Sequence, residues 1–249
     1  MRRWFLATAV VGVLVFSVPA WAQWQNNNLA VRTTGSLLRS GDALRVELVA
    51  FETVNGPFST QVTYRFRQPV AVKDEDGHVT TSMEQRVVTR PPGPTIDVLG
   101  ESQSVVLDDT FHLGQESTPG RYLVEVTILA PGRASALSTI RSCVVYQNEA
   151  PAVEACGFTV TGIKRVNAEG WLTLDGTFPD GAAYRAALVR DGRMIARFDT
   201  GVYATAPHEL DLISTALAAL AGQTFDLIVH DYRANQSVTL ARLVVPPRQ

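Results

Sequence analysis

The chain has 249 residues, and its 22 Lys and Arg residues against 24 Asp and Glu residues give a net charge of −2 at pH 7. So mild an acidity argues against nucleic acid as a partner, because nucleic acid is bound by a basic face. The length leaves room for two domains of about 100 residues, the usual size of a β-sandwich.

The start of the chain has the pattern of a secretory signal peptide. Arg2 and Arg3 form a short basic region, an apolar run follows over residues 5–16, and an Ala-x-Ala motif ends at Ala22. These are the three parts that export and signal peptidase require. The apolar run is shorter than the roughly 20 residues that span a bilayer as a helix. We therefore predict that residues 1–22 are a cleavable signal peptide.

Two other interpretations of this segment are disfavoured by its pattern. An uncleaved anchor is disfavoured by the well-formed Ala-x-Ala exit. The arginine pair also resembles a twin-arginine export signal, but it lies almost at the initiator and precedes a strongly hydrophobic run, as in ordinary secretion. The mature chain would begin at Gln23 with 20 basic and 24 acidic residues, a net charge of −4, and no later stretch is apolar for long enough to be an integral membrane segment. We expect an exported protein that is periplasmic or extracellular.

Hydrophobic residues alternate with polar ones along the first half of the mature chain. The alternating runs are 44–50, 62–66 and 122–129, and hairpin-type dipeptides occur at Asn55-Gly56 and Asp76-Gly77. Period-two alternation is typical of antiparallel strands with one buried and one wetter face. Turn dipeptides between such runs indicate hairpins. The first half is therefore predicted to be an antiparallel β-sandwich.

A polar segment with a central proline divides the chain. It covers residues 147–155 and lies between the only two cysteines, Cys143 and Cys156. Two thiols outside the cytoplasm usually form a disulfide, which would stabilise the fold by on the order of 3 kcal/mol. A redox or metal-binding pair is the alternative, but there is no Cys-x-x-Cys and no nearby histidine. We predict domains over residues 23–146 and 156–249, joined by this linker and tied by the disulfide.

The second half repeats the strand pattern. Alternating runs cover 158–161 and 225–229, and a clear hairpin covers 187–197 around Asp191-Gly192. Many short strands at this spacing indicate a sandwich or barrel rather than a βαβ fold. Residues 214–221 have leucines at helical spacing and a glycine stop signal behind them, which predicts one short helix. The predicted fold is all-β: two tandem antiparallel β-sandwiches, with the helix in the second.

The two halves share a local pattern of a glycine, an aromatic residue and a run of alternating apolar residues. It occurs over residues 120–126 and again over 222–229. This pattern resembles the penultimate strand of bacterial immunoglobulin-like and fibronectin type III-like modules. The stretch 229–237 is similar to a turn of those modules, although Ala234 stands where glycine is common. The resemblance implies two immunoglobulin-like domains, and a fold of this kind does not specify a function.

Candidate metal ligands are few. Residues 74–78 form the densest acidic cluster, which would suit Ca²⁺, but they lack the later ligands of a calcium loop and read as a hairpin tip. The four histidines are His78, His112, His208 and His230. None lies within four residues of another, unlike the paired ligands of zinc sites. His208, His230 and Asp231 belong to one predicted domain and could meet in space. We predict no metal and no cofactor.

Signatures of catalysis are missing from the sequence. There is no Gly-x-Ser-x-Gly, no His-Glu-x-x-His and no Ser-x-x-Lys, so no catalytic residue is predicted. The mature chain has two tryptophans, Trp24 and Trp171, too few for a carbohydrate-binding platform. We expect a non-catalytic binding or scaffold protein of the bacterial cell envelope, which holds another envelope or extracellular protein through sandwich loops or edge strands. The alternatives are an enzyme or metal protein with a site at the domain junction, and a periplasmic chaperone.

Overall fold

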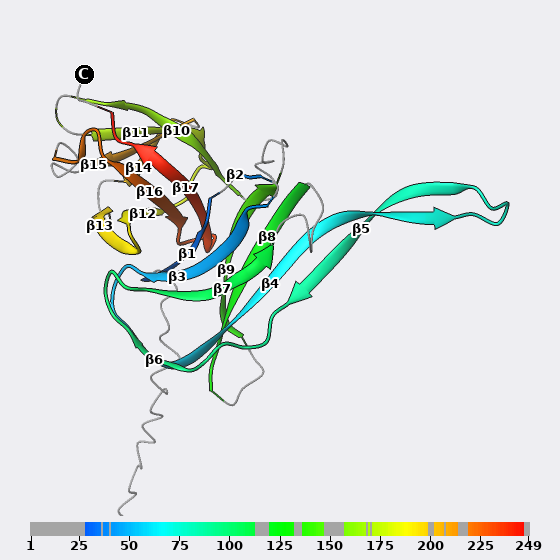
Figure 1. Ribbon diagram of the computed structural model, residues 1–249. Helices are drawn as coiled ribbons and strands as arrows, with labels where there is room; N and C mark the ends of the chain where they lie inside the picture. The colour runs from blue at the N-terminus through cyan, green and yellow to red at the C-terminus, as the bar shows by residue number, and fades with distance from the viewer. Residues whose placement is uncertain are drawn as a thin grey trace, which may run out of the picture.

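The structure is a computed structural model that describes residues 28–35, 37–39, 41–112, 120–131, 136–146, 157–167, 169, 171–198, 202–206, 208–213 and 219–246. The predicted signal peptide and the predicted linker lie outside the described residues. In the part of the chain that is described, no helix has the length and apolar character needed to cross a membrane. Figure 1 shows a molecule built of β-strands.

The prediction of an all-β fold is confirmed, with antiparallel sheets in a sandwich-like arrangement. The first half contains β1 (Leu29–Thr33), β2 (Leu37–Leu38), β3 (Ala43–Ala50), β4 (Val54–Lys73), β5 (Val79–Thr89), β6 (Ile96–Leu99), β7 (Ser104–His112), β8 (Gly120–Leu129) and β9 (Ala136–Tyr146). The second half contains β10 (Thr159–Val166), β11 (Trp171–Thr177), β12 (Tyr184–Arg190), β13 (Arg193–Phe198), β14 (Val202–Ala206), β15 (Glu209–Ile213), β16 (Thr224–Asp231) and β17 (Gln236–Val244).

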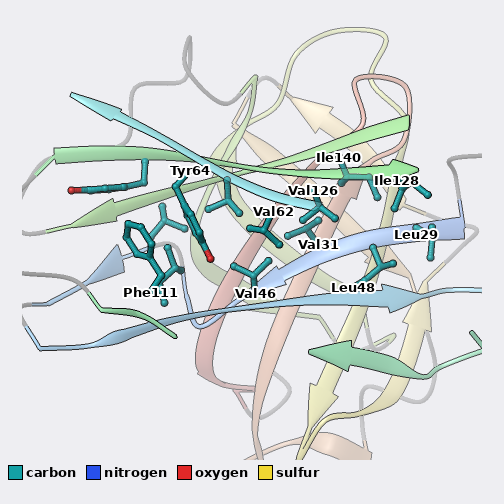
Figure 2. Packing of buried hydrophobic residues seen from close by; sticks show 14 of the residues in the cluster. Leu29, Val31, Val46, Leu48, Val62, Tyr64, Phe111, Val126, Ile128 and Ile140 are labelled. Carbon is teal, nitrogen blue, oxygen red and sulfur yellow. The ribbon is translucent and has the colours of Figure 1, made fainter. Parts of the chain in front are cut away.

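Each half has its own hydrophobic core. In the first half, the β1-β3-β7 sheet packs over β4, β8 and β9, and Figure 2 shows their side chains meeting between the strands. Tyr64 and Phe111 stack there with ring centroids 4.0 Å apart. In the second half, the β10-β11-β15-β14 sheet packs over β12, β16 and β17, around aromatic residues such as Phe158 and Tyr184.

The two halves are joined through a shared sheet. Its order is β13-β12-β16-β17-β9-β8-β4-β5, and the junction is a short parallel pairing of β17 with β9 at Gln236↔Arg141 and Ser237↔Ser142. A third apolar cluster lies between the halves and combines Ala30, Val49 and Phe51 with Ala187, Val189 and Ile228. The domain boundaries themselves stay a prediction, since the linker is outside the described residues.

The turn predictions have different outcomes. Asp191-Gly192 forms the β12–β13 hairpin, with both residues at positive φ, 52° and 73°, as a two-residue loop requires. The prediction of a turn at Asn55-Gly56 is wrong, because both residues lie inside β4. Gly56 is needed there for close packing on β6, since a Cβ atom would lie 2.2 Å from the carbonyl oxygen of Ile96.

The predicted helix over residues 214–221 falls mostly outside the described residues. Only its end is described, where residues 219–220 form a single 3₁₀ turn.

Candidate binding surface

A long hairpin made by β4 and β5 projects from the body of the molecule (Figure 1). β4 pairs with β8 over Ser59–Phe66 but with β5 over Thr63–Lys73, so the far part of β4 has only β5 beside it among the described strands. No residue from Arg67 to Val87 is buried. We call residues 67–87 the arm. It is an exposed two-stranded ribbon that adds nothing to either core.

The tip of the arm is held by local hydrogen bonds. The Asp74 carboxylate accepts the backbone N–H groups of Asp76, at 3.1 Å, and His78, at 2.7 Å. Gly77 has a φ of 86°, which is accessible to glycine without steric cost. The acidic cluster at residues 74–78 is therefore a hairpin tip, as the sequence indicated. No group of three His, Cys, Asp or Glu residues placed to hold a metal ion occurs in the described part of the chain.

The register of the arm fixes which backbone groups of β5 point outward. The amide of Asp74 donates to the carbonyl of His78 at the tip, and the amide of Arg90 donates to Val62 at the base. Hydrogen-bonded and non-hydrogen-bonded pairs alternate between these points. Pro69, which has no N–H, accordingly lies at a non-hydrogen-bonded pair, opposite Met83.

It follows that every second residue of β5 directs its N–H and C=O away from β4. These residues are Val79, Thr81, Met83, Gln85, Val87 and Thr89. In the described structure, β5 is the end of the sheet and no strand covers this edge. The backbone groups are thus available to an added strand.

The outward edge is also apolar on one face. The exposed fractions of Val79, Met83 and Val87 are 67%, 49% and 47%, and these side chains share a face because each is four residues from the next along the strand. Glu84 and Arg86 lie on the opposite face of the strand. Where the arm meets the body, a hollow of about 570 Å³ is lined by residues that include Met83, Gln85 and Tyr122.

A second hollow, of about 510 Å³, lies at the junction of the two halves. Its wall includes Arg32, which bonds Glu47 at 2.7 Å in its own half and also the Asp226 carboxylate in the other half. The Arg32 guanidinium is therefore occupied in holding the halves together. This arrangement is typical of a structural contact between domains.

The junction also buries His230. Its Nδ1 is 2.9 Å from the Ser237 hydroxyl, its ring lies against Phe51 with centroids 6.5 Å apart, and no hydrogen-bond partner is found for Nε2 among the described residues. Burial, together with the positive charge of Arg185, lowers the pKa of His230 to about 3. The imidazole is therefore neutral at ordinary pH.

The sequence left open whether His208, His230 and Asp231 meet in space, and they form no group placed to hold a metal ion among the described residues. His208 is exposed, whereas His230 is fully buried. The Asp231 carboxylate accepts the N–H groups of Arg233 and Ala234, at 2.9 and 3.2 Å, and so closes the β16–β17 turn. His78 and His112 are exposed, in other parts of the first half.

Cys143 lies on β9, opposite Leu123 of β8. Cys156 lies outside the described residues. The disulfide between Cys143 and Cys156 stays a prediction.

The sequence indicated the hairpin tip at Asp76-Gly77 but not the two long strands that make up the arm. The β-branched residues on either side of Met83, at Val79–Thr81 and Val87–Thr89, are a strand signal that was available in the sequence. The alternation predicted over 62–66 did not reveal that β4 continues to Lys73, because the exposed ribbon has no buried face to impose a pattern.

No protein family and no curated protein matches the chain. Among solved structures, it is similar to E. coli alpha-2-macroglobulin in its native conformation (11% identity, TM-score 0.26), over 84% of this chain but only 13% of that protein. It is also similar to Spo0M, a sporulation control protein from Bacillus subtilis (11% identity, TM-score 0.27), over 83% of this chain and 80% of that one. The periplasmic chaperone SfaE is similar at 12% identity and a TM-score of 0.20, over 87% and 99% of the two chains. Likenesses this distant assign neither a family nor a function.

Proposed function

We propose that the chain is a non-catalytic binding or scaffold protein of the bacterial cell envelope that holds a protein partner at the open edge of its arm. The observation that carries this proposal is the edge of β5, where outward backbone N–H and C=O groups coincide with exposed apolar side chains. An extended segment can add to such an edge as a further strand, gaining affinity from main-chain hydrogen bonds and specificity from alternate side chains.

The edge lacks most of the features that normally protect an exposed strand. Soluble proteins blunt their edges with charged side chains, especially lysine, and with proline, bulges or short strands. β5 runs for 11 residues, has no proline and no lysine, carries only Glu84 and Arg86 as charges, and pairs with β4 without a register shift. An edge left open over this length favours a strand-adding partner over a purely structural role.

Export is part of the proposal, and it rests on the signal-peptide pattern of residues 1–22. The expected mature protein begins at Gln23. Intact-mass measurement on the protein recovered from the periplasm or medium checks this. Recovery of the full-length chain in the cytoplasm would contradict it.

The binding role is tested by capture from the host envelope fraction, with residues 23–249 as bait. Two variants are matched to the bait. In the arm-trimmed variant, Asn-Gly replaces residues 67–85, so that the hydrogen-bonded pair Phe66↔Arg86 closes a two-residue hairpin. In the edge variant, Thr81→Pro removes one outward N–H but no hydrogen bond to β4. Thr81→Val, which keeps the N–H, is its control.

We expect a specific partner to be retained by the unmodified bait and by Thr81→Val. The arm-trimmed variant should lose it, and Thr81→Pro should retain much less. Circular dichroism and thermal melting confirm that each bait is folded. If the arm-trimmed variant captures the same partner in the same amount, the arm is not the binding element and the proposal fails.

A further inference from the structure

We propose that the partner at this edge is a second copy of the chain, so that two arms join through β5 in an antiparallel, two-fold arrangement centred on Gln85. This inference rests on the proposed function, because it names the partner of the same site. The argument depends on the register of β5, the positions of its two charges and the place where the open edge ends.

A two-fold antiparallel pairing centred on Gln85 uses outward backbone groups throughout. It places Gln85 opposite Gln85 of the second copy, Met83 opposite Val87, and Thr81 opposite Thr89. All of these residues direct their N–H and C=O away from β4. They would form the hydrogen-bonded pairs of the new ladder, and the residues between them would form the non-hydrogen-bonded pairs.

The same register joins opposite charges. Glu84 of each copy lies opposite Arg86 of the other, in a non-hydrogen-bonded pair, where side chains on neighbouring strands come closest. Within its own chain, Arg86 donates to the neutral Gln68 at 3.1 Å. Neither Glu84 nor Arg86 forms an ion pair among the described residues. In a two-fold dimer, the ion pair between Glu84 of one copy and Arg86 of the other would form twice, once on each side of Gln85.

Neighbouring registers are less favourable. Centring the pair on Glu84 would place two carboxylates directly opposite each other at a close pair, which is destabilising. Centring it on Met83 would place Glu84 opposite Ser82 and Arg86 opposite Thr80, which leaves all four charges without opposite charges across the interface. The charge pattern of β5 therefore selects Gln85 as the centre.

The apolar face and the strand end agree with this register. Because the two-fold axis is perpendicular to the sheet, Met83 and Val87 of both copies lie on one face and cover each other's exposed side chains. Beyond Thr89, the next outward position is Pro91, which has no N–H to donate. The ladder ends there, after Thr81 of the second copy has paired.

The test is a charge-swap cycle on residues 23–249, with the dimerisation constant measured by analytical ultracentrifugation at low salt. We expect a dimer that Glu84→Arg or Arg86→Glu weakens by about tenfold or more, since each creates two like-charge pairs. The double swap Glu84→Arg/Arg86→Glu should restore it. The two single variants, each weak alone, should form a heterodimer when mixed. Ser82→Lys, which lies opposite the uncharged Val88 in this register and leaves both of the paired charges in place, is the control for added charge on the same face.

The outcomes separate this inference from the proposed function. A dimer that persists in the arm-trimmed variant, or that ignores both swaps, overturns the inference, and so does a chain that is monomeric at all accessible concentrations. In any of these cases, loss of an envelope partner on arm trimming would still uphold the proposed function. Weakening by only one of the two single substitutions would contradict the reciprocal Glu84–Arg86 pairing and overturn the register proposed here.

Discussion

His230 shows how a single buried residue makes the junction between the halves sensitive to pH. The Nδ1 atom of His230 is paired with the Ser237 hydroxyl, whereas Nε2 has no partner among the described residues. Placing a positive charge in that environment is costly, because burial disfavours the charged form. The pKa of His230 is accordingly lowered to about 3.

The first prediction concerns stability against pH. In the unfolded chain, the His230 pKa returns to about 6.5, so the unfolded state binds a proton between pH 6.5 and 3 and the folded state does not. Stability that is present above pH 6.5 is therefore lost as the pH falls below it. At pH 5 the loss from this residue is about 2 kcal/mol.

The measurement is urea unfolding at pH 7 and pH 5. The free energy of unfolding of His230→Gln should fall less between pH 7 and pH 5 than that of the unmodified protein, by about 2 kcal/mol. His208→Gln, at an exposed position, is the matched control and should behave as the unmodified protein does. Equal losses in the protein and in His230→Gln would mean that His230 is protonated in the folded state.

At the scale of the elements, β1 is attached to the second half by side-chain hydroxyls. The amide of Val31 donates to Ser237 at 3.0 Å and the amide of Thr33 donates to Thr239 at 3.1 Å. All four residues are buried. The hydroxyls of β17 thus accept hydrogen bonds from backbone N–H groups of β1 that would otherwise be buried without an acceptor. This contact fixes how the two halves pack.

The second prediction is the cost of removing these acceptors. Ser237→Ala and Thr239→Val each leave a buried backbone N–H unpaired, which should lower the free energy of unfolding by about 1–3 kcal/mol per site. Denaturant unfolding measures the change. Thr224→Val, an isosteric change at an exposed position of β16, should alter stability by less than about 0.5 kcal/mol. Losses no larger than that control would show that water replaces the hydroxyls.

The sequence predicted the strands of the cores well, because a half-buried strand forces its residues to alternate. It failed where that condition does not hold. Val49 and Ile228 stand at the positions expected to face water, yet both are buried, since the two halves cover these faces of β3 and β16. An apolar residue on the wetter face was the available signal for this contact.

Long-range features were beyond the sequence. The parallel pairing of β17 with β9 joins residues nearly 100 positions apart, and no local pattern specifies it. Asn235 shows the same limit. The sequence placed it in a turn, but its side chain also donates to the Thr139 carbonyl at 2.7 Å and so connects the β16–β17 turn to the first half.

For the whole molecule, the contact between the halves implies that they unfold together. Two tandem modules joined only by a linker would each have an independent stability. Here the halves share a sheet, a buried apolar cluster and the Arg32–Asp226 ion pair. Unfolding one half would expose Phe51 or Ile228 to water and leave partners unpaired, so partly folded states are disfavoured.

The last prediction is that a destabilising substitution in one half also shifts the unfolding transition of the other half. Trp171 lies in β11 of the second half, and in a Trp24→Phe form of residues 23–249 its fluorescence follows that half alone, while circular dichroism follows all strands. We expect the two transitions to coincide. Phe51→Ala, in the first half, should shift both together by about 3–5 kcal/mol, because it empties a fully buried site at the junction. Val98→Ala, at a position 57% exposed, should shift neither. A Trp171 transition that stays in place while the circular dichroism signal moves would instead show two independently stable domains, with the shared sheet contributing little to either.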